Sequence, residues 1–79
     1  MKITDVVTID QEIQSGTPVF KGTRVPIQSL FWHLESGVTI DDFLEDFPSV
    51  TKKQVVELLE LSNKMVNTPQ IIRLYETVA

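Results

Sequence analysis

Apolar residues recur at helical spacing in the central part of the chain. A first set follows the spacing i, i+3, i+4 and i+7 and therefore lies on one helix face: Ile27, Leu30, Phe31 and Leu34. A second set has the same spacing: Ile40, Phe43, Leu44 and Phe47. Pro26 suits the first turn of a helix, and Gly37 suits the position just after its end. The pattern predicts two amphipathic helices that are separated near Gly37.

Capping residues indicate where the later helices begin and end. Thr39 suits the N-cap of the second helix because its hydroxyl can accept from a free backbone amide, and Pro48 prevents that helix from continuing. Thr51 and Gln54 form a capping box, in which each side chain satisfies a backbone amide of the other. A third helix is predicted from Thr51 to Asn67, with this inner face: Val55, Leu58, Leu59, Ser62, Met65 and Val66.

The two ends of the chain differ from this helical centre. Extended runs at residues 6–9, 18–20 and 23–25, with glycines between them, predict a ribbon of two or three short strands. A ribbon of this size is not stable alone. Residues 70–79 carry apolar residues at helical spacing, but about ten residues form only a marginal helix in water. This last segment must therefore dock on something.

Together these elements predict one mainly α-helical domain over residues 1–79. Its expected parts are a β ribbon in residues 1–25, a three-helix core in residues 26–67 and a C-terminal helix or tail in residues 68–79. A chain of this size has a small core, and it contains no Cys and a single His. Oligomerisation or a partner is the remaining source of stability.

Composition and charge narrow the possible partners. No apolar run approaches the roughly 18 residues that span a bilayer, and the N-terminus lacks a signal-peptide core, so a cytoplasmic protein without membrane contact is expected. The net charge of −4 argues against avid, nonspecific binding of nucleic acid. The basic residues lie outside the acidic segment 35–46, however, so a local basic patch remains possible: Lys21, Arg24, Lys52 and Lys53.

Two amphipathic helices joined by a tight turn at residues 48–50 are typical of a helix-turn-helix motif. In that motif the second helix presents its N-terminal residues to the major groove of DNA. The predicted DNA-contacting residues are accordingly Thr51, Lys52, Lys53 and Gln54, together with Lys21 and Arg24 of the ribbon. Gln54 could read adenine, and the lysines could contact phosphate or guanine.

The same pattern also fits a helical corner that never touches DNA. In that interpretation Lys52 and Lys53 are solvated, and Gln54 is fully occupied in its cap. The acidic helix of residues 41–46 counts against DNA binding, because it would lie beside the same groove and repel phosphate. Only a dimer, which doubles the contacts, makes DNA binding credible, and the residues alone leave both interpretations open.

Two segments carry candidate contacts for a protein partner. Trp32 projects roughly 140° away from Ile27 around the first helix, off its apolar face. It either anchors a partner chain or packs beneath the ribbon of its own chain, and the sequence leaves both possibilities open. In the C-terminal segment the candidate partner contacts are Ile71, Leu74 and Tyr75.

The sequence contains no arrangement suited to catalysis, metal binding or a cofactor. His33 has no second His, no Cys and no spaced carboxylate beside it, so we expect a surface histidine or one with its hydrogen bonds satisfied. No serine is placed as an activated nucleophile. Residues 16–23, GTPVFKGT, have Lys-Gly-Thr where a phosphate-binding loop requires Gly-Lys-Thr. We therefore expect a protein that is not an enzyme and binds no cofactor.

Three segments together resemble the signature of the family called domain of unknown function 433. They are residues 15–27, SGTPVFKGTRVPI, residues 34–44, LESGVTIDDFL, and residues 47–55, FPSVTKKQV. A Gly-Thr-Arg element, a helix that ends in glycine and a proline-containing turn occur in the family's order, and the resemblance runs from about Val7 to Leu61. The chain departs from the family at residues 14–18, QSGTP, where Gly-Gly-Lys-Pro is common, and residues after Asn67 lie outside the signature.

The resemblance implies a homeodomain-like three-helix core behind the β ribbon, commonly dimeric. Members of the family are usually assigned as antitoxins of the VapB type, encoded beside a PIN-like ribonuclease toxin. Such an antitoxin silences the toxin and, as a complex, represses the shared promoter. Because this toxin has an acidic metal site, the resemblance points to an inserted arginine as inhibitor, either Arg73 of the C-terminal helix or Arg24 of the ribbon.

Two functions are therefore expected as alternatives. The first is the antitoxin of a type II toxin–antitoxin pair, with a PIN-like ribonuclease toxin, operator DNA and a second copy of the chain as partners. The second is a small homodimeric protein-interaction module without DNA binding, which the negative net charge favours.

Overall fold

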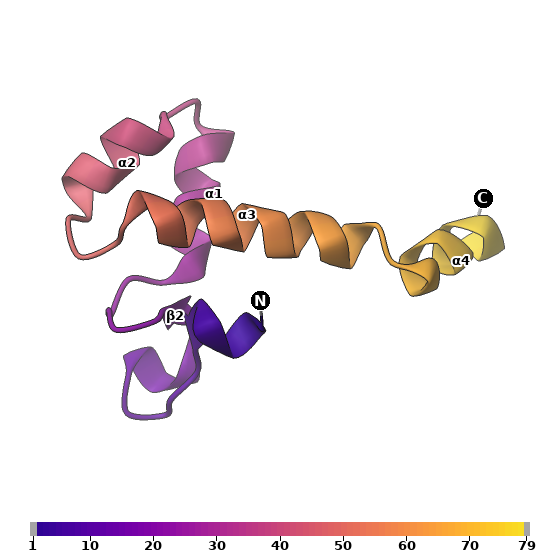
Figure 1. The fold of residues 1–79 in the computed structure, drawn as a ribbon, viewed down its shortest axis with the longest axis horizontal. Coiled ribbons are helices and arrows are strands. Elements are labelled where there is room, and N and C mark those ends of the chain that lie inside the picture. The colour runs from indigo at the N-terminus through magenta and orange to yellow at the C-terminus, as the bar shows by residue number, and fades with distance from the viewer. Residues whose placement is uncertain (1, 79) are drawn as a thin grey trace.

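The computed structural model describes residues 2–78, and these residues form four α-helices and one two-stranded antiparallel sheet (Figure 1). Two short 3-10 helices, η1 and η2, lie near the N-terminus. The elements in chain order are η1 Ile3–Asp5, β1 Val7–Thr8, η2 Gln14–Gly16, β2 Val19–Phe20, α1 Ile27–Glu35, α2 Ile40–Asp46, α3 Lys52–Val66 and α4 Pro69–Val78. The predicted mainly helical chain with an N-terminal ribbon is confirmed.

The ribbon is shorter than the sequence pattern indicates. Strands β1 and β2 pair through Val7 with Phe20 and through Thr8 with Val19. Of the two or three strands expected, two are present: residues 23–25 follow a turn at 21–22 and form no strand, and an isolated bridge joins Val19 to Pro26. The Thr23 hydroxyl donates to the Phe20 carbonyl at 2.8 Å and accepts from the Val25 amide at 3.0 Å. This local bonding, next to Gly22 at a φ of 77°, bends the chain, and backbone bonds from the Phe20 amide to the Val25 carbonyl and from the Ile27 amide to the Pro18 carbonyl limit its pairing with β2 to one bridge.

The predicted helix caps are present, and Pro26 lies one position away from its expected place. The Thr39 hydroxyl accepts from the Asp42 amide at the start of α2. Pro26 is the N-cap of α1, with an extended ψ of 139°, instead of lying within the first turn. The predicted stop of the third helix at residues 67–69 is confirmed, since α3 ends at Val66, and Pro69 is also the first residue of α4, where its missing N–H has no partner to lose. The hydroxyl of Thr68 accepts from the Ile71 amide there, at 3.3 Å.

One hydrophobic core joins the ribbon to the first three α-helices. The Phe20 ring of β2 lies 6.3 Å from the Phe43 ring of α2, centroid to centroid. The buried core residues are Val6, Phe20, Leu30, Phe43, Val50, Val55 and Leu58. The predicted apolar faces of α1 and α2 and the first half of α3 therefore all point into the same core. The ribbon is stabilised by the helices, as a ribbon of this size requires.

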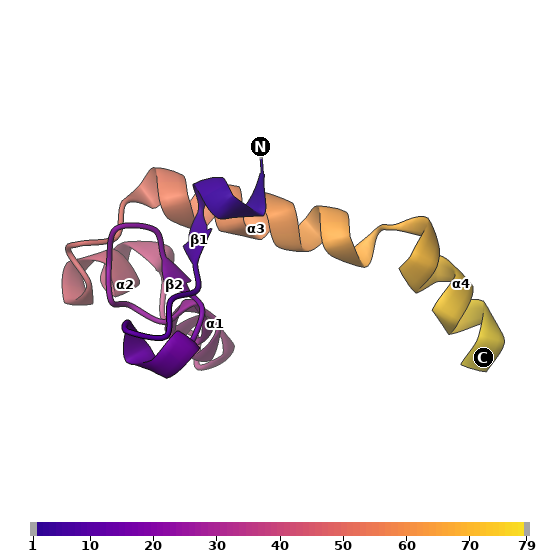
Figure 2. The same cartoon turned by 90° about the horizontal axis from the view of Figure 1, so that it is seen from below.

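The second half of α3 extends beyond this core. Val55 and Leu58 are buried, but Met65 is 59% and Val66 63% exposed, so the prediction that these two line an inner face was wrong. A helix of 15 residues is about 22 Å long, and Figure 2 shows its far end leaving the folded body. Apolar residues therefore continue at helical spacing along α3 beyond the part of the helix that packs on the core.

Helix α4 continues outward from α3 without packing on the body (Figures 1 and 2). Every residue of Pro69–Val78 is exposed. A helix of this marginal length requires a surface to dock on. Within the described residues, this chain does not provide that surface. None of the helices in residues 2–78 is long and apolar enough to cross a membrane.

Candidate functional site

The sharp turn between α2 and α3 is present as predicted. The Phe47 amide donates to the Phe43 carbonyl as α2 ends, and the Val50 amide donates to the Phe47 carbonyl at 3.0 Å. Val50 is only 4% exposed and fixes the turn to the core. The chain therefore reverses between two amphipathic helices and presents the first turn of α3 at the surface.

Both lysines of that first turn are exposed, and each has an acidic neighbour. Lys52 Nζ lies 3.8 Å from Asp41 Oδ1 on α2, and Lys53 Nζ lies 3.8 Å from Glu57 Oε1 one turn further along α3. Solvent-exposed ion pairs of this kind are weak, so an approaching phosphate could compete for either lysine. The lysines are accessible, but their positive field is partly cancelled.

Gln54 is bonded at both ends of its side-chain amide. Its Oε1 accepts from the Thr51 amide at 3.0 Å and completes the predicted capping box. Its Nε2 donates to the carbonyl of Lys21, 33 residues away in the chain, at 2.9 Å. Gln54 could contact a base only if these bonds opened. In this conformation it joins the ribbon to the start of α3, a role that its sequence position did not reveal.

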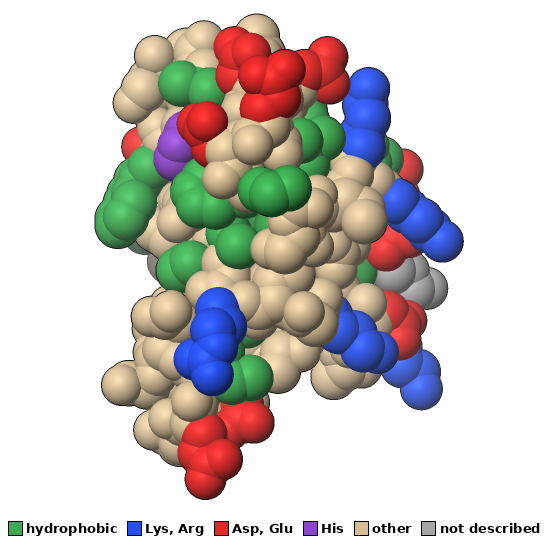
Figure 3. Space-filling model, turned by 90° about the vertical axis from the view of Figure 1, so that its left-hand side faces the viewer, with side chains coloured by type: hydrophobic (Ala, Val, Ile, Leu, Met, Phe, Trp, Pro, Cys, Tyr) green, Lys and Arg blue, Asp and Glu red, His purple; other side chains and the backbone are tan. Residues whose placement is uncertain are grey.

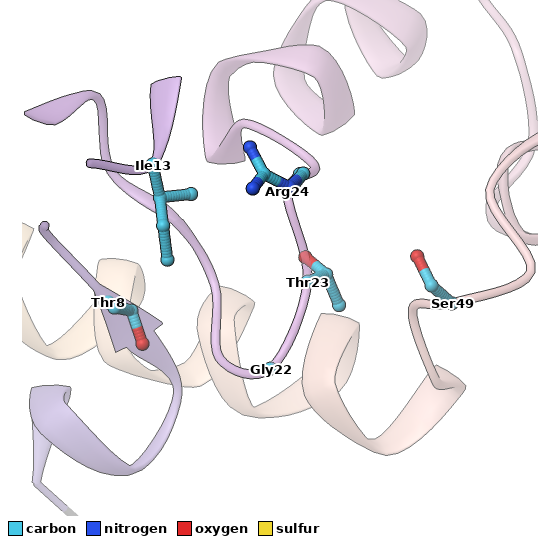
Figure 4. A pocket seen from close by; sticks show the side chains of 6 residues that line it. All are labelled: Thr8, Ile13, Gly22, Thr23, Arg24 and Ser49. Atoms are coloured by element: carbon cyan, nitrogen blue, oxygen red, sulfur yellow. The ribbon is translucent and has the colours of Figure 1, made fainter. Parts of the chain in front are cut away.

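The loop between β2 and α1, residues 21–26, is called the ribbon loop. It carries the other two candidate DNA-contacting residues, Lys21 and Arg24, and both are exposed. Arg24 lines an open pocket of about 600 Å³ between this loop, the ribbon and the turn before α3 (Figure 4). The lining residues are Thr8, Ile13, Gly22, Thr23, Arg24 and Ser49. No sequence motif marks this pocket, because the segments that form it are far apart in the chain.

Charged side chains form no continuous basic surface on the end of the molecule that Figure 3 shows. Lys and Arg side chains appear there in separate groups, and acidic side chains gather above and below them. The four basic candidates lie in the ribbon loop and the first turn of α3, and the Gln54 bond to Lys21 holds these two segments together. Any nucleic-acid contact would therefore involve a few separate cations.

Trp32 projects from α1 into solvent, with 60% of its surface exposed. The alternative that it packs beneath the ribbon of its own chain was wrong. It borders a shallow pocket of about 300 Å³ together with His33, Ser36 and Val38. The imidazole of His33 shares a hydrogen bond with the Ser29 carbonyl and packs edge-on against the rings of Phe43 and Phe47. His33 is thus a satisfied histidine, as expected.

The candidate partner contacts of α4 are exposed on a helix that projects from the body. The exposed fractions are 43% for Ile71, 60% for Leu74 and 71% for Tyr75. Arg73 is also exposed on α4. Arg24 precedes α1, at the other end of the fold from α4 (Figure 1), so the two arginines belong to different surfaces. Residues 2–78 contain no group of three His, Cys, Asp or Glu side chains that could hold a metal ion.

This architecture is that of a small, mainly helical protein with a turn between two helices and an undocked terminal helix. A family model described as "Protein of unknown function (DUF433)" matches residues 7–61, and the chain belongs to that family. The chain is 33% identical over 51 residues to "Uncharacterized protein y4eO" of Sinorhizobium fredii. The match covers 65% of this chain and 23% of that protein, so the chain spans less than a quarter of its relative. No solved structure matches the chain.

Proposed function

We propose that this protein is the antitoxin of a type II toxin–antitoxin pair, acting in the cytoplasm against a PIN-like ribonuclease toxin. The observation that carries the proposal is α4, a ten-residue amphipathic helix of which every residue is exposed. An isolated helix of this length is marginal in water, so its apolar face gains stability when a partner covers it. A segment that projects beyond the body is well suited to occupy the groove of another protein.

The inhibitory role is assigned to Arg73. It lies on the same helix as Ile71, Leu74 and Tyr75, at about 200° around the helix from Ile71 by helical spacing. A cleft that encloses α4 would bury the apolar face on one wall and meet the guanidinium on the other. An acidic metal site is a suitable counterpart for a guanidinium. Arg24 is the weaker candidate, because it lies away from this helix.

Autorepression is assigned to the other end of the fold. We propose that α1, α2 and α3 act as a homeodomain-like helix-turn-helix core, with the first turn of α3 in the major groove. The exposed Lys52 and Lys53 and the intact turn support this assignment. Because the chain carries a net charge of −4, a homodimer that doubles the basic contacts is part of the proposal.

Toxin neutralisation can be tested by co-expression with the PIN-like ribonuclease encoded beside this gene. The ribonuclease alone should arrest growth, and the wild-type chain should restore it. The variant Leu74→Asp should fail to restore growth, because it places a charge on the apolar face of α4. Ile9→Asp is the matched control: Ile9 is 65% exposed on the ribbon side, so this change should leave rescue intact. Full rescue by Leu74→Asp, or a neighbouring gene of another kind, would contradict the proposal.

A homodimeric protein-interaction module without DNA binding is the second candidate. The net charge favours it, and so do the ion pairs that Lys52 and Lys53 make with Asp41 and Glu57. Gel shifts with the gene's own upstream DNA over a range of salt concentrations separate the two candidates. A repressor should bind that DNA and lose affinity steeply as salt rises, whereas an interaction module should not shift it at any salt.

A further inference from the structure

We propose that the pocket between the ribbon loop and the turn before α3 binds backbone phosphates of duplex DNA, with Arg24 as the main contact. This inference rests on the proposed repressor role and assigns a phosphate site to it. The pocket is about 600 Å³ in volume and takes its lining from β1, the ribbon loop and the turn at Ser49 (Figure 4). It lies next to the turn that positions α3. None of its lining residues belongs to the first turn of α3, which would contact the bases in the proposed repressor.

The pocket is positively charged on an otherwise acidic protein. Arg24 is the one ionisable residue among the six that line it. Within residues 2–78, no carboxylate lies within salt-bridge distance of Arg24, whereas Lys52 and Lys53 each have such a neighbour. Arg24 therefore has the least neutralised charge of these three cations. Guanidinium groups bind phosphate strongly because two parallel N–H bonds can meet two of its oxygens.

Further hydrogen-bond donors around Arg24 have no partner in the described part of the chain. The hydroxyls of Thr8 and Ser49 make no hydrogen bond to another residue of 2–78, and neither do the backbone amides of Gly22 and Arg24. Gly22 also lacks a Cβ, and a Cβ built there would meet nothing within 4 Å, so a ligand can approach the loop closely. Free backbone amides in a turn favour an anion.

The arrangement fits a strand of phosphates better than a single small anion. Figure 4 shows Arg24 and Thr23 on the central loop, Thr8 and Ile13 to one side of it and Ser49 to the other. Donors on both sides of a loop can follow successive phosphates along one DNA strand. The bond from Gln54 Nε2 to the Lys21 carbonyl fixes this loop to the start of α3. Phosphate binding at Arg24 would therefore set the position of α3 relative to the groove.

Salt-dependent binding of the full-length chain to a short duplex of arbitrary sequence tests the pocket. Phosphate contacts do not depend on base sequence, so Arg24→Gln should weaken binding to every duplex by about tenfold at low salt. The slope of log affinity against log salt should become shallower by about 1. Ser49→Ala should weaken binding without changing the slope. The matched control, Lys64→Gln, removes one positive charge from the far end of α3 and should change neither quantity.

Amide chemical shifts of the wild-type chain, titrated with the same duplex, give a second readout. Gly22, Arg24 and Ser49 should shift together with the first turn of α3. If the duplex binds but Arg24→Gln keeps the wild-type slope and the loop amides do not move, the phosphate pocket is wrong while the repressor role stands. If the wild-type chain binds no duplex at all, the repressor role and the pocket both fail, and the toxin-rescue experiment still decides the antitoxin role.

Discussion

At the scale of single residues, Gln54 both caps α3 and joins that helix to the ribbon, and only the cap follows from its sequence position. The capping box predicts one of its bonds, to the Thr51 amide, but the second bond reaches the Lys21 carbonyl of the ribbon. That contact depends on where the ribbon packs, which local spacing cannot reveal. The same holds for Arg24 and Ser49, which meet at one pocket although 25 positions separate them. A residue's chemistry could be inferred from the sequence, but its neighbours required the fold.

Gln54→Ala should lower the free energy of unfolding by about 1–2 kcal/mol, because it removes a helix cap and a bond between two elements. Gln54→Glu separates the two contributions. A carboxylate can still accept from the Thr51 amide, but it cannot donate to the Lys21 carbonyl, so this variant should lose only part of that stability. Urea unfolding followed by circular dichroism measures both changes, and Gln28→Ala, at an exposed position of α1, is the control.

A loss in Gln54→Glu as large as that in Gln54→Ala would show that the capping box contributes nothing measurable. No loss in either variant would show that the ribbon is held to α3 by apolar packing alone. The proposed position of the Arg24 loop beside the first turn of α3 would then lack its polar support.

At the scale of elements, a helix or strand boundary could be predicted where residues close to it in the sequence determine it. The starts of α2 and α3 could be predicted because the threonine directly before each helix caps it, with a hydroxyl that accepts from the amide three positions further on. The choice between two and three strands could not, because the Thr23 hydroxyl and the single bridge to β2 decide whether residues 23–25 form a strand. The end of α3 before Pro69 could also be predicted, and the same proline begins α4, because its missing N–H suits the first position of a helix.

The inner face predicted for α3 shows a limit of periodicity. Helical spacing identifies which side chains share a face, and it was correct for Val55 and Leu58. Helical spacing does not show how far along the helix the core extends. Met65 and Val66 follow the same pattern and are exposed. Apolar residues that continue past a core are expected where a second protein contributes the rest of the interface. The candidate partner surface thus begins on α3 and continues onto α4.

At the scale of the whole molecule, the projecting helix makes the chain larger than its length requires. The Cα radius of gyration is 14.2 Å, whereas a compact domain of this length has about 12 Å. The principal extents of 41, 30 and 22 Å show the same elongation. The body and α4 are therefore expected to behave independently until a partner is bound, since no described residue of α4 is buried.

Removing residues 69–79 tests this independence. The urea midpoint of the body should stay unchanged, because the truncation removes no buried residue of the described chain. The radius of gyration from X-ray scattering on the monomer should fall to about 11 Å, the value for a compact chain of the remaining length. Leu58→Ala, which opens a cavity in the core, should instead lower stability by roughly 2–4 kcal/mol. A truncated chain with a lower midpoint and an unchanged radius would mean that α4 folds back onto the body in solution, and its apolar face would then be unavailable to a toxin.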